Sequence, residues 1–391
     1  MVSIACGGTG GHLFPGLAVA DPLVRSGCAV QLLISPKDVD REGVKSAEGM
    51  EIIALPAVGL QPGAFLSFLR GAWRSYRIAR ATFRRRRPAA LLAMGGFTSL
   101  APVVACRQIG VPVFLHESNS IPGRANRLLS FCAEQVFVGF PSTARRFGHR
   151  RVIVTGTPVR MRIQPMNEGP CRSSLGFEPD RPLLLITGGS QGARAINDIV
   201  ISALPLLAAR LPELQYIHLT GPHDFDKVNA AYVARRLKAV VRPFLSEMDL
   251  ALAAATAAIS RAGASSLAEF AAARVPAILI PYPAAADNHQ FFNATAFVES
   301  GAARMIEQGR ATPELLVAIA QELIIDSSRR NSMRSALTQW HRPDAGNQIV
   351  TQILSTIEQN GRPAARTNGS KVDARLSRGS DRAEARSIAT V

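Results

Sequence analysis

The sequence predicts an α/β protein made of two similar domains, each with a doubly wound parallel sheet, and three observations lead to this prediction. Short apolar segments such as residues 183–186 alternate with stretches of helical spacing along the chain, which is typical of parallel sheets covered on both faces. Glycine-rich loops follow two such segments, at residues 7–11 and 188–192. A segment of the first half also recurs in the second half, so we expect a duplicated α/β unit.

The internal repeat relates residues 95–118 to residues 261–283. Its length favours duplicated α/β units over a solenoid of short repeats. Ligands of such sheets bind beyond the carboxyl ends of the strands, so two facing sheets would enclose a cleft lined by glycine loops from both halves. The matching positions are Gly96 with Gly263, residues 99–101 with residues 266–268, and, after a short gap, residues 111–112 with residues 275–276.

The halves join in a region with proline, glycine and asparagine but little periodicity, residues 158–170. The tail after residue 360 carries seven Lys/Arg and three Asp/Glu, and it lacks the apolar periodicity of a folded segment. We therefore expect two Rossmann-like domains, a C-terminal helix that packs back on the first domain, and a disordered basic tail. Their expected bounds are 1–162, 163–340, 341–360 and 361–391.

Composition excludes several classes of protein. Five cysteines without a C-x-x-C pair argue against a disulfide framework and a structural zinc site, and we expect a reducing cytosol. The start of the chain lacks a secretory signal pattern, and no apolar run approaches the ~18 residues of a membrane span. The net charge of +16 by itself suggests nucleic-acid binding. The arginine-rich segment lacks a base-reading motif, however, so we expect no nucleic-acid partner.

The first glycine-rich loop fits neither of two common nucleotide-binding motifs. Leu13 stands where a dinucleotide fingerprint needs its third glycine, and no lysine follows as a P-loop requires. A buried strand is expected at residues 4–6 and a helix at residues 17–24. Glycine lets backbone N–H groups close on an anion, and a helix N-terminus adds its dipole. The pattern predicts a phosphate or sugar-phosphate site, with a tight packing turn as the alternative.

Seven motifs occur in a fixed order along the chain: GGTGGHLFPGLAVA, MGGFTSLAP, HESNSIPGRANR, GTPVR, GGSQGARAIN, SRAGASSLAE and DNHQFFNA. In this order they resemble the peptidoglycan N-acetylglucosaminyltransferases of glycosyltransferase family 28, over residues 1–358. The resemblance implies the GT-B fold, in which two Rossmann-like domains with doubly wound parallel sheets face each other across a cleft. It assigns the acceptor and membrane side to the first domain and the donor side to the second.

The resemblance also implies a reaction. N-acetylglucosamine passes from UDP-N-acetylglucosamine to the 4-hydroxyl of the muramic acid in lipid I, an undecaprenyl-linked muropeptide, and gives lipid II with inversion at the anomeric carbon. No metal and no other cofactor is implied. Such a transferase acts in peptidoglycan synthesis, and hence in cell-wall biogenesis, cell shape, cell division and the cell cycle. The alternatives are a related GT-B enzyme that glycosylates another membrane lipid and a UDP-sugar epimerase of the same fold.

Inversion needs a base for the acceptor hydroxyl and stabilisation of the departing UDP. We expect His12 to be the base, because imidazole can be neutral near pH 7 and His12 ends the glycine loop on the acceptor side. The alternative is a histidine that caps the next helix. Glu117, at the end of another strand, is expected to orient His12 or to replace it. Thr9, Gly10 and Gly11 are expected to shape the pocket.

The donor site is expected in the second domain, around residues 264–268. Ala264, Ser265 and Ser266 begin a helix, so their N–H groups can hold the α-phosphate without a metal, and Leu267 and Ala268 continue the motif. The other expected donor contacts are Glu269 to the ribose, Ser190 to the phosphates, Arg160 as a nearby positive charge, Leu245 against uracil, Gln290 to the sugar hydroxyls with His289 and Asn293 nearby, and Asn119 from the first domain. Each has a structural alternative, such as a solvated arginine, a packing leucine or a loop asparagine.

A basic amphipathic helix is expected over residues 65–88, with eight arginines and no acidic residue. Apolar side chains recur at helical spacing from Phe65 to Phe83, flanked by Leu66 and Trp73, and the arginines form a second stripe. This pattern is typical of a helix on an anionic membrane surface, and the alternative is a core-facing helix with a solvated basic face. Because the implied acceptor carries a polyprenyl chain, we expect a peripheral protein on the cytoplasmic face of the cell membrane.

Overall fold

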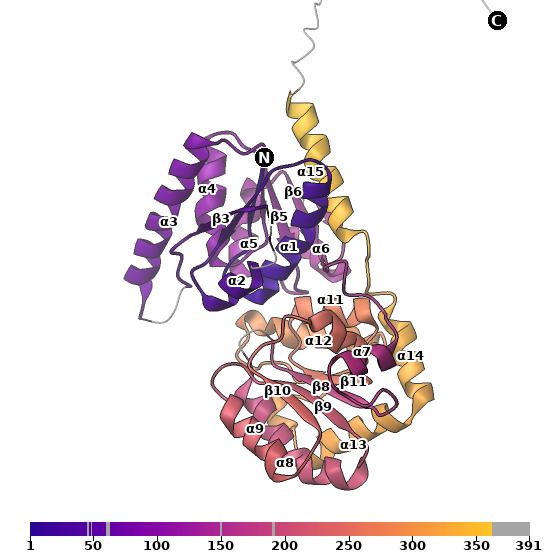
Figure 1. Cartoon of the computed structure of the whole chain (residues 1–391). Helices are drawn as coiled ribbons and strands as arrows, with labels where there is room; N and C mark the ends of the chain where they lie inside the picture. The colour runs from indigo at the N-terminus through magenta and orange to yellow at the C-terminus, as the bar shows by residue number, and fades with distance from the viewer. Residues whose placement is uncertain (45–46, 48, 60–62, 149–150, 190–191, 362–391) are drawn as a thin grey trace, which may run out of the picture.

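The chain forms two parallel sheets, one in each half, which lie one above the other in Figure 1. The computed structural model describes residues 1–44, 47, 49–59, 63–148, 151–189 and 192–361. The first half and the last helix form the upper body, and the second half forms the lower one (Figure 1). This architecture confirms the predicted fold class.

The first sheet carries the elements that approach the site from the acceptor side. Its strands are β1 (Val2–Ala5), β2 (Val30–Ile34), β3 (Glu51–Ala54), β4 (Ala90–Ala93), β5 (Val113–Glu117), β6 (Gln135–Val138) and β7 (Val152–Val154). They lie in the order β3-β2-β1-β4-β5-β6-β7, and neighbouring strands run parallel. On the central strand, Ile4 is in register with Leu32 and Leu92.

The second sheet repeats this topology. Its strands are β8 (Leu183–Thr187), β9 (Gln215–Leu219), β10 (Ala239–Arg242), β11 (Ala257–Ser260), β12 (Ala277–Leu279) and β13 (Ala303–Met305). The order β10-β9-β8-β11-β12-β13 puts β8 in the place of β1 and β11 in the place of β4. Gly96 and Gly263 accordingly follow equivalent strands, so the two sheets share the strand order around these positions that two similar units would have.

Helices cover both faces of the first sheet. They are α1 (Gly10–Arg25), α2 (Asp38–Gly43), α3 (Phe65–Arg85), η2 (Phe97–Ser99), α4 (Leu100–Gln108), α5 (Arg124–Leu129), η3 (Ser130–Cys132), α6 (Pro141–Ala144), η4 (Arg145–Phe147) and α15 (Ala345–Gly361). Ile4 and Leu32 pack against α1 and α15 on one face. Ala5 and Leu33 pack against α3 and α4 on the other, because successive residues of a strand point to opposite faces.

The second sheet is covered in the same way. Its helices are α7 (Glu168–Ser174), α8 (Arg194–Arg210), α9 (Phe225–Ala234), α10 (Met248–Ala254), α11 (Ala264–Ala273), η5 (Ala286–Asn288), α12 (His289–Glu299), η6 (Gln308–Arg310), α13 (Pro313–Ile325) and α14 (Ser327–Leu337). Leu183 and Leu185 pack towards α10, α11 and α12. Leu184 and Ile186 pack towards α8, α9 and α13, so β8 is buried on both faces.

The helix after the first glycine loop begins earlier than predicted. The sequence predicts a helix only over residues 17–24, because glycine and proline, which are poor helix formers, precede it. In the structure, Thr9 is the extended N-cap, and its carbonyl accepts the N–H groups of His12 and Leu13, each at 3.1 Å. His12 therefore lies in the first turn of α1 rather than at the end of a loop.

The chain crosses between the two bodies twice. The first crossing lies between β7 and α7 (residues 155–167), and the second lies between α14 and α15 (residues 338–344). Gly156, in the first crossing, has φ +79°, and a Cβ there would lie 2.6 Å from Cγ of Arg342 in the second. Phe140 of the first half also packs on Phe297 and Trp340 of the second, whose rings stack with centres 4.4 Å apart. After the second crossing, α15 buries its apolar side chains in the core of the first half.

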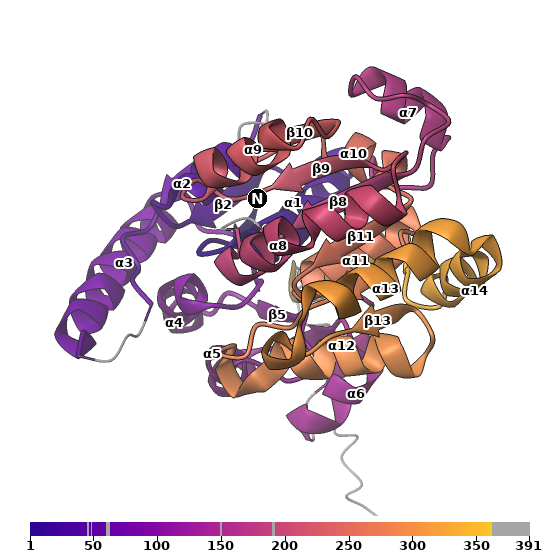
Figure 2. The same ribbon diagram turned by 90° about the horizontal axis from the view of Figure 1, so that it is seen from below.

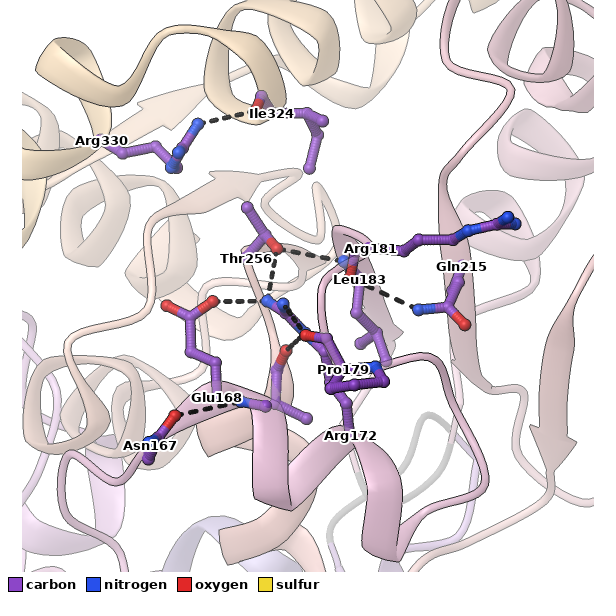
Figure 3. Close-up of polar contacts among 12 residues, drawn as sticks. Asn167, Glu168, Arg172, Pro179, Arg181, Leu183, Gln215, Thr256, Ile324 and Arg330 are labelled. Carbon is purple, nitrogen blue, oxygen red and sulfur yellow. Dashed lines mark hydrogen bonds and ion pairs between the residues drawn. The ribbon is translucent and has the colours of Figure 1, made fainter.

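The chain after the first crossing is fixed to the second sheet by Arg172 of α7 (Figure 3). This arginine is 6% exposed, and its guanidinium donates to the carbonyls of Ala254 and Pro179 and to the hydroxyl of Thr256, each at 2.9 Å. It also pairs with Glu168. A buried charge needs this many partners, and the partners tie α7 to the second half.

The basic helix α3 lies at the outer edge of the molecule, as Figure 2 shows from below. Its buried residues are Gly71, Ser75, Ala79 and Phe83. The C-terminal part of the predicted apolar stripe, Ala79 and Phe83, therefore faces the core. Among the described helices, α3 included, none combines the length and the apolar character that a bilayer crossing requires.

Candidate active site

A cavity of about 1200 Å³ lies between the two bodies, at the carboxyl ends of the central strands. Both glycine loops, the first turn of α1, the first turn of α11 and the first crossing contribute to its walls. The predicted site residues that line it are Thr9, Gly10, Gly11, His12, Asn119, Arg160, Leu245, Ala264, Ser265, Ser266, Glu269 and Gln290. Residues far apart in the sequence therefore meet here, as two facing sheets require.

Five predicted residues, Asn293 among them, do not line the described part of the cavity. Ser190 lies outside the described residues. Leu267 is 1% exposed in the core of the second half, because it lies on the inner face of α11, and Ala268 is also absent from the cavity wall. Glu117 lies behind the wall, where it is 3% exposed.

The His12 ring packs against the backbone of the loop that follows β4, at Gly95 and Gly96. A Cβ on Gly95 would lie 3.3 Å from its Cε1, and one on Gly96 would lie 3.0 Å from its Nε2. Burial lowers the pKa of His12, and the negative charge of Glu117, a hydrogen bond to the Met94 backbone and the negative charge of Asp40 oppose that shift only in part. The imidazole is therefore neutral near pH 7, as a general base requires.

Glu117 is fully engaged by the loop that follows β5. Its carboxylate accepts the N–H and the side-chain amide of Asn119 at 2.9 and 3.0 Å, the N–H of Gly123 at 2.8 Å and the side-chain amide of Asn126 at 3.0 Å. A carboxylate with four donors and little exposure has no free approach to substrate. The geometry favours Glu117 as the residue that orients the Asn119 loop beside His12, rather than as a replacement base.

The first turn of α11 forms the opposite wall. Gly263 is its extended N-cap, with φ −67° and ψ 134°, and no side chain caps the helix. The first N–H groups of a helix have no partner within it, and Ala264, Ser265 and Ser266 line the cavity. The arrangement suits an anion such as a diphosphate. Within the described residues, no cluster of His, Cys, Asp and Glu could hold a metal ion.

Arg160 and Glu269 form an ion pair across the two halves. The guanidinium donates to Oε1 of Glu269 at 3.1 Å, and the two side chains are 12% and 13% exposed. The guanidinium also lies 4.4 Å from the ring centre of Phe14 on α1. Burial raises the pKa of Glu269, and Arg160 opposes that shift. Sequence reasoning placed both residues near the donor, but it did not predict that they bind each other.

The α12 end of the cavity offers amide and imidazole groups. Gln290 accepts the N–H of Tyr282 through Oε1 at 3.0 Å, which leaves its side-chain NH₂ for a ligand. His289 also lines the cavity, and its Nδ1 lies 2.8 Å from the carbonyl of Ala286. Because a carbonyl only accepts, Nδ1 is the protonated nitrogen of neutral His289.

Asn293 has a different position from the one predicted. It is fully buried and accepts the N–H and hydroxyl of Ser120, each at 2.9 Å. It donates to Oδ1 of Asn119 and to the carbonyl of Ala262, each at 3.1 Å. All its polar atoms are therefore used to join the two halves, and it does not contact the cavity. The prediction missed this because it depends on a loop from the other domain.

Two further features were missed from the sequence. Asp287 pairs with Arg124 at 3.2 Å and with Arg127, both on α5 of the first half. Arg261 lines the cavity, is 7% exposed, and donates to the carbonyl of Ile280 at 2.9 Å. Arg261 belongs to the motif SRAGASSLAE and Asp287 to the motif DNHQFFNA, but the motifs alone do not indicate what either charge binds.

Comparison with known proteins identifies the family. Residues 2–138 match the glycosyltransferase family 28 N-terminal domain, and residues 183–349 match the glycosyltransferase family 28 C-terminal domain. This chain belongs to glycosyltransferase family 28. The family resemblance and the GT-B fold inferred from the motifs are thereby confirmed.

Two relatives that match this family 28 chain over nine-tenths of its length have the same description. The UDP-N-acetylglucosamine–N-acetylmuramyl-(pentapeptide) pyrophosphoryl-undecaprenol N-acetylglucosamine transferase of Anaeromyxobacter dehalogenans (strain 2CP-1) is 36% identical over 373 residues, which covers 91% of this chain and 93% of that protein. The protein of the same description from Pelobacter propionicus is also 36% identical, and the match covers 90% of this chain and 98% of the relative.

Solved structures agree with this family 28 assignment. The crystal structure of MurG from Acinetobacter baumannii matches with a TM-score of 0.69 at 29% identity, covering 90% of this chain and 99% of that one. A putative UDP-N-acetylglucosamine 2-epimerase from Listeria monocytogenes matches with a TM-score of 0.70 at 14% identity, covering 93% and 98%. At that identity, the epimerase shares the fold alone.

Proposed function

We propose that this family 28 enzyme transfers N-acetylglucosamine from UDP-N-acetylglucosamine to the 4-hydroxyl of N-acetylmuramic acid in lipid I, and so makes lipid II for peptidoglycan. The relatives that share nine-tenths of the chain carry this activity in their description. The observation that carries the proposal is the cavity itself, because His12 lines one side and the first turn of α11 lines the other. The product serves cell-wall growth, cell shape and cell division.

Each wall of the cavity supplies one part of an inverting transfer, the base on the His12 side and the stabilisation of UDP on the α11 side. The acceptor oxygen attacks the anomeric carbon while its proton passes to the neutral imidazole of His12. The bond from that carbon to the β-phosphate oxygen breaks on the opposite side, and UDP leaves with the electron pair. N–H groups at the start of α11 stabilise the charge on the departing diphosphate. Glu117 acts indirectly, by holding Asn119 and its loop at the edge of the cavity.

The donor lies along the second half. The Glu269 carboxylate binds the ribose hydroxyls, and its partner Arg160 supplies positive charge near the diphosphate. Gln290 donates from its free NH₂ to the sugar hydroxyls, and the backbone at Leu245 contacts uracil. These roles rest on their position in the cavity wall and on the hydrogen bonds described above. Ser190 remains a proposed phosphate ligand.

The proposed membrane contact is the first half of α3. Phe65, Leu66, Leu69 and Trp73 are 59%, 70%, 45% and 61% exposed, and exposed arginines surround them. Exposed aromatic and basic side chains on one helix favour binding to an anionic lipid surface. We therefore infer a peripheral enzyme on the cytoplasmic face of the membrane, where its polyprenyl-linked acceptor lies.

A transfer assay tests the proposed reaction. Purified enzyme is incubated with radiolabelled UDP-N-acetylglucosamine and either a short-chain lipid I analogue or diacylglycerol. Label is expected in the lipid I analogue alone, and UDP-glucose is expected to be a poor donor. Transfer to diacylglycerol instead would support the alternative of a glycolipid synthase, and formation of UDP-N-acetylmannosamine without transfer would indicate an epimerase.

A further inference from the structure

Asp40 is a buried carboxylate that the reaction described above does not use directly. It belongs to α2 and is 0% exposed. Its Oδ2 accepts the N–H of Gly8 at 2.7 Å, and it also accepts the N–H and the hydroxyl of Ser35 at 3.0 and 2.5 Å. Hydrogen bonds to a carboxylate are roughly twice as strong as neutral ones. Asp40 therefore fixes the Gly8 peptide to the end of β2.

Lys37 holds the same glycine from the other side. Its Nζ donates to the carbonyl of Gly8 at 3.0 Å and lies 5.4 Å from the ring centre of Phe97. Thr98 donates to the carbonyl of Gly7 at 2.6 Å. Both polar groups of Gly8 are thus bound to side chains from the segment after β2.

Gly8 needs such support because of its backbone conformation. Its φ is +110°, and a Cβ there would lie 3.1 Å from the ring of Phe97, so another side chain would be strained. Glycine, however, loses more conformational freedom on folding than any other residue. A loop built from it keeps one conformation only when other groups hold it.

The orientation of the Gly8 peptide reaches His12 through the start of α1. Thr9 follows Gly8, and its carbonyl accepts the N–H of His12 at 3.1 Å. A rotation at Gly8 would therefore shift the whole first turn, including Gly10 and Gly11 in the cavity wall. A misplacement of ~1 Å of a reacting group can cost ~100-fold in rate.

We infer that Asp40 and Lys37 are positioning residues, which fix the Gly8 peptide so that the His12 imidazole faces the acceptor hydroxyl. The inference rests on the proposed function, because it takes His12 as the base. Neither Asp40 nor Lys37 lines the cavity, so neither is expected to contact a substrate.

The charge of Asp40 also reaches His12. The titratable groups that face the imidazole are Glu117 of β5 and Asp40 of α2, which raise its pKa, and His289 of α12, which lowers it together with burial. Removal of the Asp40 charge therefore lowers the His12 pKa further. Since the neutral form is the base, the acidic limb of the kcat/KM profile moves to lower pH in such a variant.

Asp40→Asn tests the inference, because it keeps the shape and one accepting oxygen but removes the charge. With a soluble lipid I analogue, kcat is expected to fall about 10- to 100-fold, while KM for UDP-N-acetylglucosamine changes less than about threefold, because the second domain holds the donor. An NMR titration of the His12 imidazole is expected to give a lower pKa than in wild type. The matched control is Asp198→Asn, a half-exposed carboxylate paired with Lys227 on the second domain, which is expected to change none of these values.

A folded Asp40→Asn variant with wild-type kcat and an unshifted His12 titration would overturn the inference. If Asp40→Asn does not fold, Lys37→Ala decides the matter, because Lys37 is exposed and its loss leaves the core intact. About a tenfold lower kcat with unchanged thermal stability and donor KM supports the inference, and a wild-type kcat refutes it. The NMR titration needs no acceptor, so a wild-type enzyme that fails to glycosylate lipid I refutes the proposed function separately.

Discussion

At the residue scale, burial controls the chemistry of the cavity. His12 lies against two glycines that leave room for its ring, and burial lowers its pKa. Glu269 is buried as well, and burial raises its pKa while Arg160 opposes that shift. The same physical cause therefore keeps the proposed base neutral and makes the proposed ribose ligand depend on its arginine partner.

His12→Ala is expected to lower kcat by roughly two to four decades, as for a lost general base. The KM for UDP-N-acetylglucosamine should change little, because the donor lies on the second half. Steady-state kinetics with a soluble acceptor measure both. Activity of the variant within threefold of wild type would remove His12 from the role of base.

The pH profile follows from the sign of the His12 shift. Burial favours the neutral imidazole, so wild-type kcat/KM is expected to fall only below the ordinary histidine pKa of about 6.5. An acidic limb above that value would contradict the burial argument. The profile is measured at saturating donor, with a stability control at each pH.

Glu117→Gln distinguishes an orienting role from a catalytic one. Glutamine has a single accepting oxygen for the four donors around this site, so the free energy of unfolding is expected to drop by about 1–3 kcal/mol, and kcat is expected to fall with it. Denaturant unfolding and kinetics are measured on the same preparation. Loss of all turnover with unchanged stability, in an enzyme whose His12→Ala variant stays active, would instead make Glu117 the base.

At the scale of elements, helix N-termini and loops from two sheets build the site, and this limits what sequence can predict. Motifs located both glycine loops and the start of α11, because a strand, a glycine and a helix start are local features. The Arg160–Glu269 pair and the Asn293–Ser120 contact join different domains, so no local pattern could predict them. The early start of α1 was missed because the first residues of the helix are Gly10 and Gly11, and glycine is a poor helix former.

The basic helix α3 is expected to bind anionic membranes. Arg70 and Arg74 are exposed beside Trp73, and each arginine near an anionic leaflet contributes about 1 kcal/mol. Changing both to Gln is expected to weaken binding to anionic vesicles by roughly 30-fold at low salt, and less at high salt. Co-sedimentation with vesicles measures this.

The matched control for α3 changes Arg210 and Arg235, two exposed arginines of the second half, to Gln. This variant has the same net charge as the α3 variant and is expected to bind vesicles like wild type. Equal weakening by both variants would mean that total charge, rather than α3, determines binding.

At the scale of the whole molecule, the two bodies are linked by polar contacts beside the cavity. Asp287 pairs with Arg124 and Arg127, and Asp287 and Asn288 both have positive φ, 50° and 53°. The turn that precedes His289 is thus held in an uncommon conformation by charges of the other domain. We therefore expect donor binding at α12 to be coupled to the approach of the two halves.

Asp287→Asn is expected to raise KM for UDP-N-acetylglucosamine about 3- to 10-fold, by loosening the start of α12. Because salt screens exposed ion pairs, raising ionic strength should bring the wild-type KM towards that of the variant. Glu213→Gln, which removes a surface partner of Arg181, is the control and should leave KM unchanged. A salt-independent wild-type KM would argue against the coupling.

The stereochemistry of the product shows whether the cavity catalyses an inverting transfer to lipid I. Wild-type enzyme is supplied with UDP-N-acetylglucosamine, whose sugar is α-linked, and a soluble lipid I analogue, and the purified disaccharide product is examined by NMR. A β-configured N-acetylglucosamine on the 4-oxygen of N-acetylmuramic acid is expected, because the acceptor attacks opposite to the departing UDP. An α-configured product, or a sugar attached at any other position, would contradict it.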